Sequence, residues 1–194
     1  MCSGYCKPNI LSLSFKNKKI MEVLDIIKER FSPYEFTDKP VAQEDLNTLF
    51  EAAGKAASAF NEQPWRFIYA LREDEAVFKN IHECLVEGNQ GWTTNVAALM
   101  ITVVSKNFAK NGNPNTVAKH DLGLAVGNLS VQAQAMGIHL HQMAGIIPQN
   151  CIDKLNIPEG FEPVTAIALG YYEGESGVKG RKVVNEIAFK GIWK

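Results

Sequence analysis

An arginine followed two residues later by a serine stands near the beginning of the sequence, in Arg30-Phe31-Ser32-Pro33-Tyr34. A guanidinium and a hydroxyl at this spacing, where the chain leaves a predicted helix, can bind a phosphate through charge-assisted hydrogen bonds. The late pair Arg181-Lys182 could supply a second cationic contact to the same phosphate. Simpler interpretations are a surface arginine beside a helix-ending Ser-Pro and solvated charges in a tail.

Two further segments carry groups that could bind a planar heterocycle. Ser58, Asn61 and Gln63 lie in one loop before a predicted strand, and such side chains both donate and accept hydrogen bonds. The segment Met143-Ala144-Gly145 follows another predicted strand, and a turn of small residues exposes backbone N–H groups to a flat ring. The alternatives are a turn whose Asn and Gln bond their own backbone and an ordinary strand-to-helix turn.

In this order along the chain, the segments resemble the FMN-dependent nitroreductase family. The resemblance extends from Arg30 to about Lys182. It includes R-x-S followed by a phenylalanine, the block S-x-x-N-x-Q-P-W-R-F that begins at Ser58, the N-x-x-W region at Asn89, a long central helix and the late arginine. The block from Ser58 to Phe67 is the most specific of these.

The resemblance implies a homodimer with two FMN molecules at the subunit interface, each contacted by both chains. By position, the first and last segments match the family's phosphate and ribityl contacts, and the loop at Ser58 lines the ring and the ribityl chain. Asn89 matches a contact to the pyrimidine edge, and Gly145 matches a turn whose N–H points toward flavin N5. The implied FMN-binding residues are Arg30, Ser32, Tyr34, Ser58, Asn61, Gln63, Asn89, Trp92, Met143, Ala144, Gly145, Arg181 and Lys182.

Three positions depart from the family's pattern. Tyr34 stands where many members carry a basic residue close to flavin N1 and O2, and Trp92 stands where some carry a lysine. Two-electron reduction leaves negative charge near N1, and nearby cations favour that form. Because these two basic residues are replaced, we expect a lower reduction potential of the flavin or a larger role for backbone dipoles. Ala144 replaces an acidic residue that some members have beside N5, which leaves the choice between NADH and NADPH open.

The activity that the resemblance implies is a ping-pong transfer of electrons from NADH or NADPH, through flavin N5, to a nitroaromatic, quinone or enone. No side chain need act as a nucleophile or general acid, so no catalytic residue is predicted. Phe108 could cover the acceptor, although packing within its own subunit is the favoured explanation. The alternatives are the same fold with reductive dehalogenation or oxygen-dependent flavin chemistry, and an FMN-binding protein that does not turn over.

The elements that must position these residues are helices and strands in alternation, without repeats. The predicted helices cover residues 19–30, 43–56, 74–86, 115–136 and 148–155, and the predicted strands cover residues 66–71, 97–104, 138–142 and 164–169. This pattern favours an α+β or α/β sandwich with helices around one sheet. The resemblance implies its nitroreductase-like form, an α+β fold that is a three-layer α-β-α sandwich with a central mixed sheet and a long central dimer helix. Residues 1–17 are predicted to be an irregular tail, and residues 18–194 a single domain.

Gly123 and Gly127 lie four residues apart on one face of the long predicted helix. Glycine inside a helix costs about 1 kcal/mol relative to alanine, which implies a reason for keeping two of them. Close approach by another backbone, from a partner subunit, is the favoured reason, and a tightly packed internal helix is the alternative.

Composition excludes several other classes of function. A net charge of −1 gives no basic field for nucleic acid, and no apolar run approaches the roughly 20 residues of a membrane span. We expect a cytoplasmic protein whose four cysteines are free thiols. His139 and His141 share a strand face, but no third metal ligand is visible, so two ordinary strand histidines are the favoured interpretation. His120-Asp121 resembles half of a catalytic dyad but has no nucleophile to serve.

Overall fold

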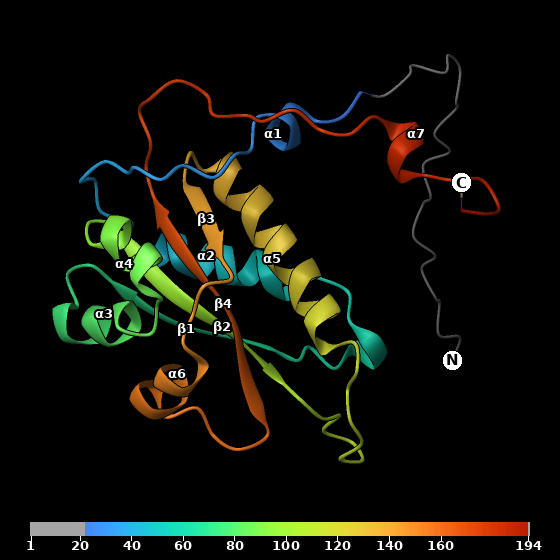
Figure 1. The fold of residues 1–194 in the computed structure, drawn as a ribbon, viewed down its shortest axis with the longest axis horizontal. Coiled ribbons are helices and arrows are strands. Elements are labelled where there is room, and N and C mark those ends of the chain that lie inside the picture. Colours follow the sequence, from blue (N-terminus) through green and yellow to red (C-terminus); the bar gives the residue numbers. More distant parts are fainter. Residues whose placement is uncertain (1–21, 194) are drawn as a thin grey trace, which may run out of the picture.

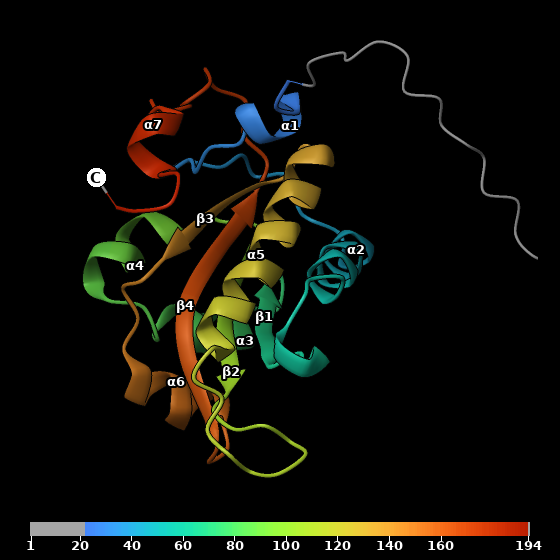
Figure 2. The ribbon, with the colours of Figure 1, turned by 90° about the vertical axis from the view of Figure 1, so that its right-hand side faces the viewer.

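A computed structural model describes residues 22–193, and the predicted tail at residues 1–17 lies outside this range. A four-stranded sheet lies between two layers of helices (Figure 1). The helices α2 (Gln43–Gly54) and α5 (Ala118–Ala135) cover one face. The helices α3 (Glu75–His82) and α6 (Pro148–Leu155) cover the other, as the view along the layers in Figure 2 shows. The α+β sandwich is therefore confirmed.

The sheet has the strand order β1-β2-β4-β3, and each neighbouring pair is antiparallel. The strands are β1 (Trp65–Leu71), β2 (Ala98–Ser105), β3 (His139–Met143) and β4 (Phe161–Gly170). For these described strands the expectation of a mixed sheet is wrong. A continuously apolar strand is typical of parallel sheets because helices cover both of their faces. Here helices cover both faces of an antiparallel sheet, so the sequence pattern is the same while the strand direction differs.

The central strand β2 shows how the two cores are divided. Ala98 and Met100 pack toward α2 and α5, whereas Leu99 and Ile101 pack toward α3 and α6. Successive side chains of a strand point to opposite faces, so a strand buried on both sides must be apolar at every position. This explains the uninterrupted apolar run that the sequence shows between residues 97 and 104.

The helix α5 buries only one side. Its buried residues recur at helical spacing and pack on the sheet, whereas Gly123 and Gly127 lie on the exposed side. A Cβ atom placed on either glycine would have no heavy atom of the described chain within 4 Å. Tight packing inside one subunit therefore does not explain these two glycines.

Two helices differ from the sequence prediction. The helix α1 (Asp25–Lys28) is shorter than the predicted residues 19–30, and its apolar Val23, Leu24 and Ile27 are exposed. Short helices depend on tertiary packing, and about half of the surface of each of these side chains stays exposed in the described chain. The helix α4 (Glu87–Thr93) was not predicted, because its two glycines weaken any helical signal.

The chain that follows β4 leaves the sheet and carries α7 (Val184–Ile187) outside the three layers (Figure 1). This segment exposes several large apolar side chains, namely Val183, Val184, Ile187, Ile192 and Trp193. Trp193 alone is 85% exposed. Within residues 22–193, no helix has the length and apolar character that crossing a membrane requires.

Candidate functional site

The structure brings Arg30, Ser32 and Arg181 together in one hollow of about 180 Å³, which we call the arginine cavity. Arg30 Nη1 donates a hydrogen bond to Ser32 Oγ at 3.4 Å. The pKa of Arg30 is lowered, mainly because burial disfavours its charge and secondly because Arg181 faces it. None of the described residues that line this cavity is acidic. Two guanidinium groups without a carboxylate between them form a site for an anion.

The second basic residue at this cavity differs from the sequence prediction. Lys179 lines the arginine cavity together with Arg181, whereas Lys182 is an exposed residue farther along the tail. The guanidinium of Arg181 donates to the backbone carbonyl of Lys179 at 3.2 Å, which places the two residues side by side.

A second hollow, the helix cavity, of about 350 Å³, adjoins the first and is also lined by Arg30 and Ser32. Its other wall is the exposed side of α5, at Gly123, Gly127 and Ser130. The hydroxyl of Ser130 is buried and has no hydrogen-bond partner among the described residues. An unpartnered buried hydroxyl costs free energy, which a polar ligand in this hollow would relieve.

The turn after β3 is held by α4. The Gly145 carbonyl accepts a hydrogen bond from Asn89 Nδ2 at 3.0 Å and another from the Val86 N–H at 3.1 Å. A Cβ atom at Gly145 would lie 2.6 Å from Asn89 Nδ2 and 2.7 Å from Val86 Cγ2. Glycine is therefore required here by close packing. Of the neighbouring residues, Met143 is buried in the core and Ala144 is exposed.

An aromatic cluster links this turn to the arginine cavity. The rings of Tyr34 and Trp92 lie 5.2 Å apart, and the His141 ring lies 4.4 Å from Tyr34 and 4.8 Å from Trp92. His141 also lines the arginine cavity, and its Nδ1 lies 2.8 Å from the Pro33 carbonyl oxygen. The sequence analysis set His141 aside as an ordinary strand histidine. The missed signal is its place on the strand that leads into Gly145.

The loop at Ser58 forms a separate group. Ser58 Oγ accepts a hydrogen bond from the Gln63 N–H at 3.0 Å, and Gln63 Nε2 donates to the Asn61 carbonyl at 3.3 Å. Within one chain these polar groups bond their own loop, which was one of the two interpretations left open. Phe60, Asn61 and Gln63 all have positive φ angles of 51–57°. Such values are uncommon for residues other than glycine and cluster at functional sites.

Asp121 holds this strained loop, and the sequence analysis did not select it for that role. Its buried carboxylate accepts a hydrogen bond from the Ala59 N–H at 3.0 Å. His120 Nδ1 lies 3.3 Å from the other carboxylate oxygen, but the pair anchors a loop and serves no nucleophile.

The loop and the arginine cavity lie toward opposite ends of α5. Figures 1 and 2 show the 3₁₀ turn η1 (Ala59–Asn61) near the N-terminal end of α5, while the chain after α1 crosses near its C-terminal end. An α-helix of this length spans about 27 Å. One chain therefore does not bring all of the selected residues together.

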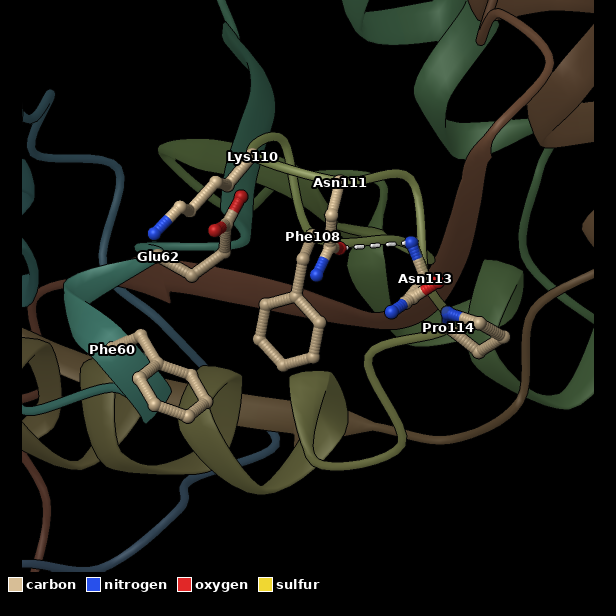
Figure 3. Close-up of a pocket in the computed structure, with 7 residues that line it drawn as sticks. All are labelled: Phe60, Glu62, Phe108, Lys110, Asn111, Asn113 and Pro114. Carbon is tan, nitrogen blue, oxygen red and sulfur yellow. Dashed lines mark hydrogen bonds between the residues drawn. The ribbon is translucent and has the colours of Figure 1, made fainter.

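The largest hollow of those described, about 730 Å³, lies beside η1, and we call it the aromatic cavity. Phe60 is 94% exposed, and its ring meets that of Phe108 edge to face at 5.8 Å. Figure 3 shows both rings at the same opening, with Glu62 and Lys110 on one side. Phe108 packs on this exposed ring of its own chain and is itself only partly buried. Phe60 is a residue that the sequence analysis missed.

Comparisons with known proteins show the family to which the chain is similar. The model of the "Nitroreductase family" matches residues 27–171. The FMN reductase [NAD(P)H] of Bacillus subtilis is 27% identical over 82% of this chain and 70% of its own length. The major NAD(P)H-flavin oxidoreductase of Aliivibrio fischeri is 28% identical over 69% of this chain and 79% of its own. The crystal structure of an oxidoreductase containing FMN is 30% identical, with a TM-score of 0.83 over 91% of this chain and 96% of that one.

Proposed function

Because the chain belongs to the nitroreductase family, we propose that it is a flavin oxidoreductase that binds FMN and takes electrons from NADH or NADPH. The observation that carries the proposal is the arginine cavity, where Arg30 and Arg181 face each other without an acidic neighbour. The phosphate of FMN is negatively charged, and this positively charged cavity would accommodate it. The similar proteins named above, with FMN and NAD(P)H in their descriptions, support the same cofactor and donor.

The residues of the site fit this cofactor from one end to the other. Arg30, Ser32 and Arg181 would bind the phosphate, and the helix cavity beside Ser130 would accommodate the polar chain that follows it. Asn89 and the turn at Gly145 would lie along the ring. When bound, FMN supplies the redox chemistry, by accepting a hydride from the nicotinamide and passing electrons to an acceptor. The protein's part is to hold and orient the cofactor and to exclude water from it.

The proposed assembly is a homodimer in which each FMN lies between two chains. In one chain the loop at Ser58 lies away from the arginine cavity, so a partner would have to supply the second half of each site. The exposed glycine face of α5 leaves room for another backbone, and the apolar side chains after β4 are uncovered. A surface of this kind is typical of a protein–protein interface.

The proposed acceptors are planar, electron-poor molecules such as nitroaromatics, quinones and enones. The aromatic cavity supports this class because the exposed ring of Phe60, with Phe108, offers a face and an edge for stacking. In the proposed dimer this cavity would open beside the partner's cofactor. Lys110 at the same opening would favour acceptors that carry an anionic substituent.

Initial rates measured over a grid of NADH and quinone concentrations test the proposed mechanism. If donor and acceptor use the same place in turn, the double-reciprocal plots are parallel lines, and substitution of Phe60→Ala raises the KM for the quinone. Converging lines would contradict a ping-pong exchange. Oxygen consumption with breakdown of FMN would favour oxygen-dependent flavin chemistry. A bound flavin that neither NADH nor NADPH reduces would favour a protein that binds FMN without turnover.

A further inference from the structure

We propose that His141 is a positioning residue of the FMN site, which fixes the phosphate-binding segment Arg30–Tyr34 against the sheet. The inference rests on the proposed function and assigns a role to a residue outside the set that the sequence singled out. His141 would act through the backbone of Pro33 and not through a bond to the reacting part of the cofactor.

The hydrogen bond between His141 and Pro33 joins residues 108 positions apart, at 2.8 Å. A carbonyl oxygen only accepts, so the hydrogen lies on His141 Nδ1. Among the described residues, no other hydrogen bond holds a backbone atom of residues 30–36. Among the described residues, this is therefore the one hydrogen bond that ties the backbone of residues 30–36 to the sheet, and the next is made by the Thr37 N–H to the Tyr171 carbonyl at 2.8 Å. Apolar packing adds to it, since the Phe31 ring lies 5.0 Å from that of His139.

The backbone of His141 is part of the sheet. His141 lies on the edge strand β3, which pairs with β4 from His139 to Met143. Its ring also packs on both Tyr34 and Trp92, with centroid distances of 4.4 and 4.8 Å. The same strand continues directly into the turn at Gly145. His141 thus links the phosphate end of the site to the ring end.

His139 provides a matched control on the same face of the same strand. Its ring packs edge to face on Phe31 at 5.0 Å and on Tyr172 at 5.7 Å. Its Nδ1 is buried without a partner among the described residues, and burial lowers the pKa of this imidazole. Replacing His139 therefore removes packing near the segment but no hydrogen bond to it.

The test titrates the wild type and the variants His141→Leu, His141→Asn and His139→Leu with FMN and separately with riboflavin, following flavin fluorescence. Riboflavin has the same ring and ribityl chain but no phosphate. His141→Leu is expected to weaken FMN binding about tenfold, the upper size of one lost hydrogen bond, and to leave riboflavin binding nearly unchanged. His141→Asn, whose amide can donate to the same carbonyl, should retain most of the preference for FMN, and His139→Leu should retain all of it.

A ratio of FMN to riboflavin affinity in His141→Leu equal to that of the wild type would overturn the proposal, whether both affinities stay the same or both fall equally. If His141→Leu does not fold, His141→Gln decides in the same way, because its amide is displaced by one carbon and should lose the preference. A wild-type protein that binds neither flavin would overturn the proposed function itself, which separates the two failures.

Discussion

Two guanidinium groups that share a cavity repel each other, and burial adds to the cost, so the pKa of Arg30 lies below its ordinary value. A bound anion relieves both effects, which makes Arg30 and Arg181 better binders of phosphate than two isolated surface arginines. At the scale of single residues, this pair is the strongest electrostatic feature of the site.

Substituting Arg30→Ala should weaken FMN binding by about tenfold to a hundredfold, because a charge-assisted contact contributes about 1.5–3 kcal/mol. Fluorescence titration of the apoprotein measures the change. The matched control is Arg72→Ala, since Arg72 binds the Asn95 carbonyl at 2.7 Å and does not line the arginine cavity. An affinity in Arg30→Ala equal to that of the wild type, with an intact fold, would remove Arg30 from the site.

The sequence identified both arginines of the site, but it missed Lys179 and the residues whose role depends on distant contacts. Arg30, Ser32 and Arg181 were selected because a cation or hydroxyl shows its chemistry in its own side chain. His141 acquires a role only through Pro33, and Asp121 only through Ala59, 62 positions earlier. No local pattern encodes such a pairing.

At the scale of elements, α4 and the turn after β3 form one unit. Two hydrogen bonds converge on the Gly145 carbonyl, and there is no space for a side chain at that residue. The contact fixes Asn89 and Gly145 relative to each other, which is what a site along a planar ring requires.

Substituting Gly145→Ala should lower the free energy of unfolding by about 1–3 kcal/mol and weaken FMN binding, because the new methyl group must displace Asn89 or Val86. Urea denaturation and flavin titration measure the two effects. Gly88→Ala, on the helix α4 that holds this turn, is the matched control, since a Cβ there meets nothing within 4 Å. A Gly145→Ala protein as stable and as tightly bound to FMN as Gly88→Ala would contradict this account of the turn.

Periodicity predicted the elements with strong apolar patterns and missed those without them. Residues 148–155 were predicted as a helix and form α6, and the long apolar seam of α5 was recognised within a turn at each end. The helix α4 was not predicted, because Gly88 and Gly91 interrupt its apolar pattern. Its stability comes from contacts such as the hydrogen bond from Asn89 to the Gly145 carbonyl. Tertiary contacts, which a sequence window does not contain, decide such short helices.

At the scale of the whole molecule, two features point outward from the sandwich. The glycine face of α5 is open, and the segment after β4 exposes Trp193 and neighbouring apolar side chains. Strand direction and assembly depend on contacts between distant parts of the molecule and with a partner, and the apolar pattern of the sequence encodes neither. The sequence could therefore give the three layers but not the antiparallel order of the sheet.

Substituting Gly127→Leu should leave the fold of the subunit intact and weaken the dimer by about tenfold or more. A Cβ atom at this position has no atom of the described chain within 4 Å, whereas a leucine side chain would obstruct a helix of a partner. Sedimentation equilibrium measures the dissociation constant. The control Gly54→Leu, at the end of α2 and also in open space, should associate like the wild type. Equal association of the two variants would place the interface elsewhere.

The most direct test of the central claim is an anaerobic absorbance titration of the FMN-loaded protein with NADH and then with NADPH. The account predicts that the flavin bands bleach with at least one of the nucleotides and return when a quinone is added. A protein that takes up no FMN, or whose bound flavin neither nucleotide reduces, would contradict it.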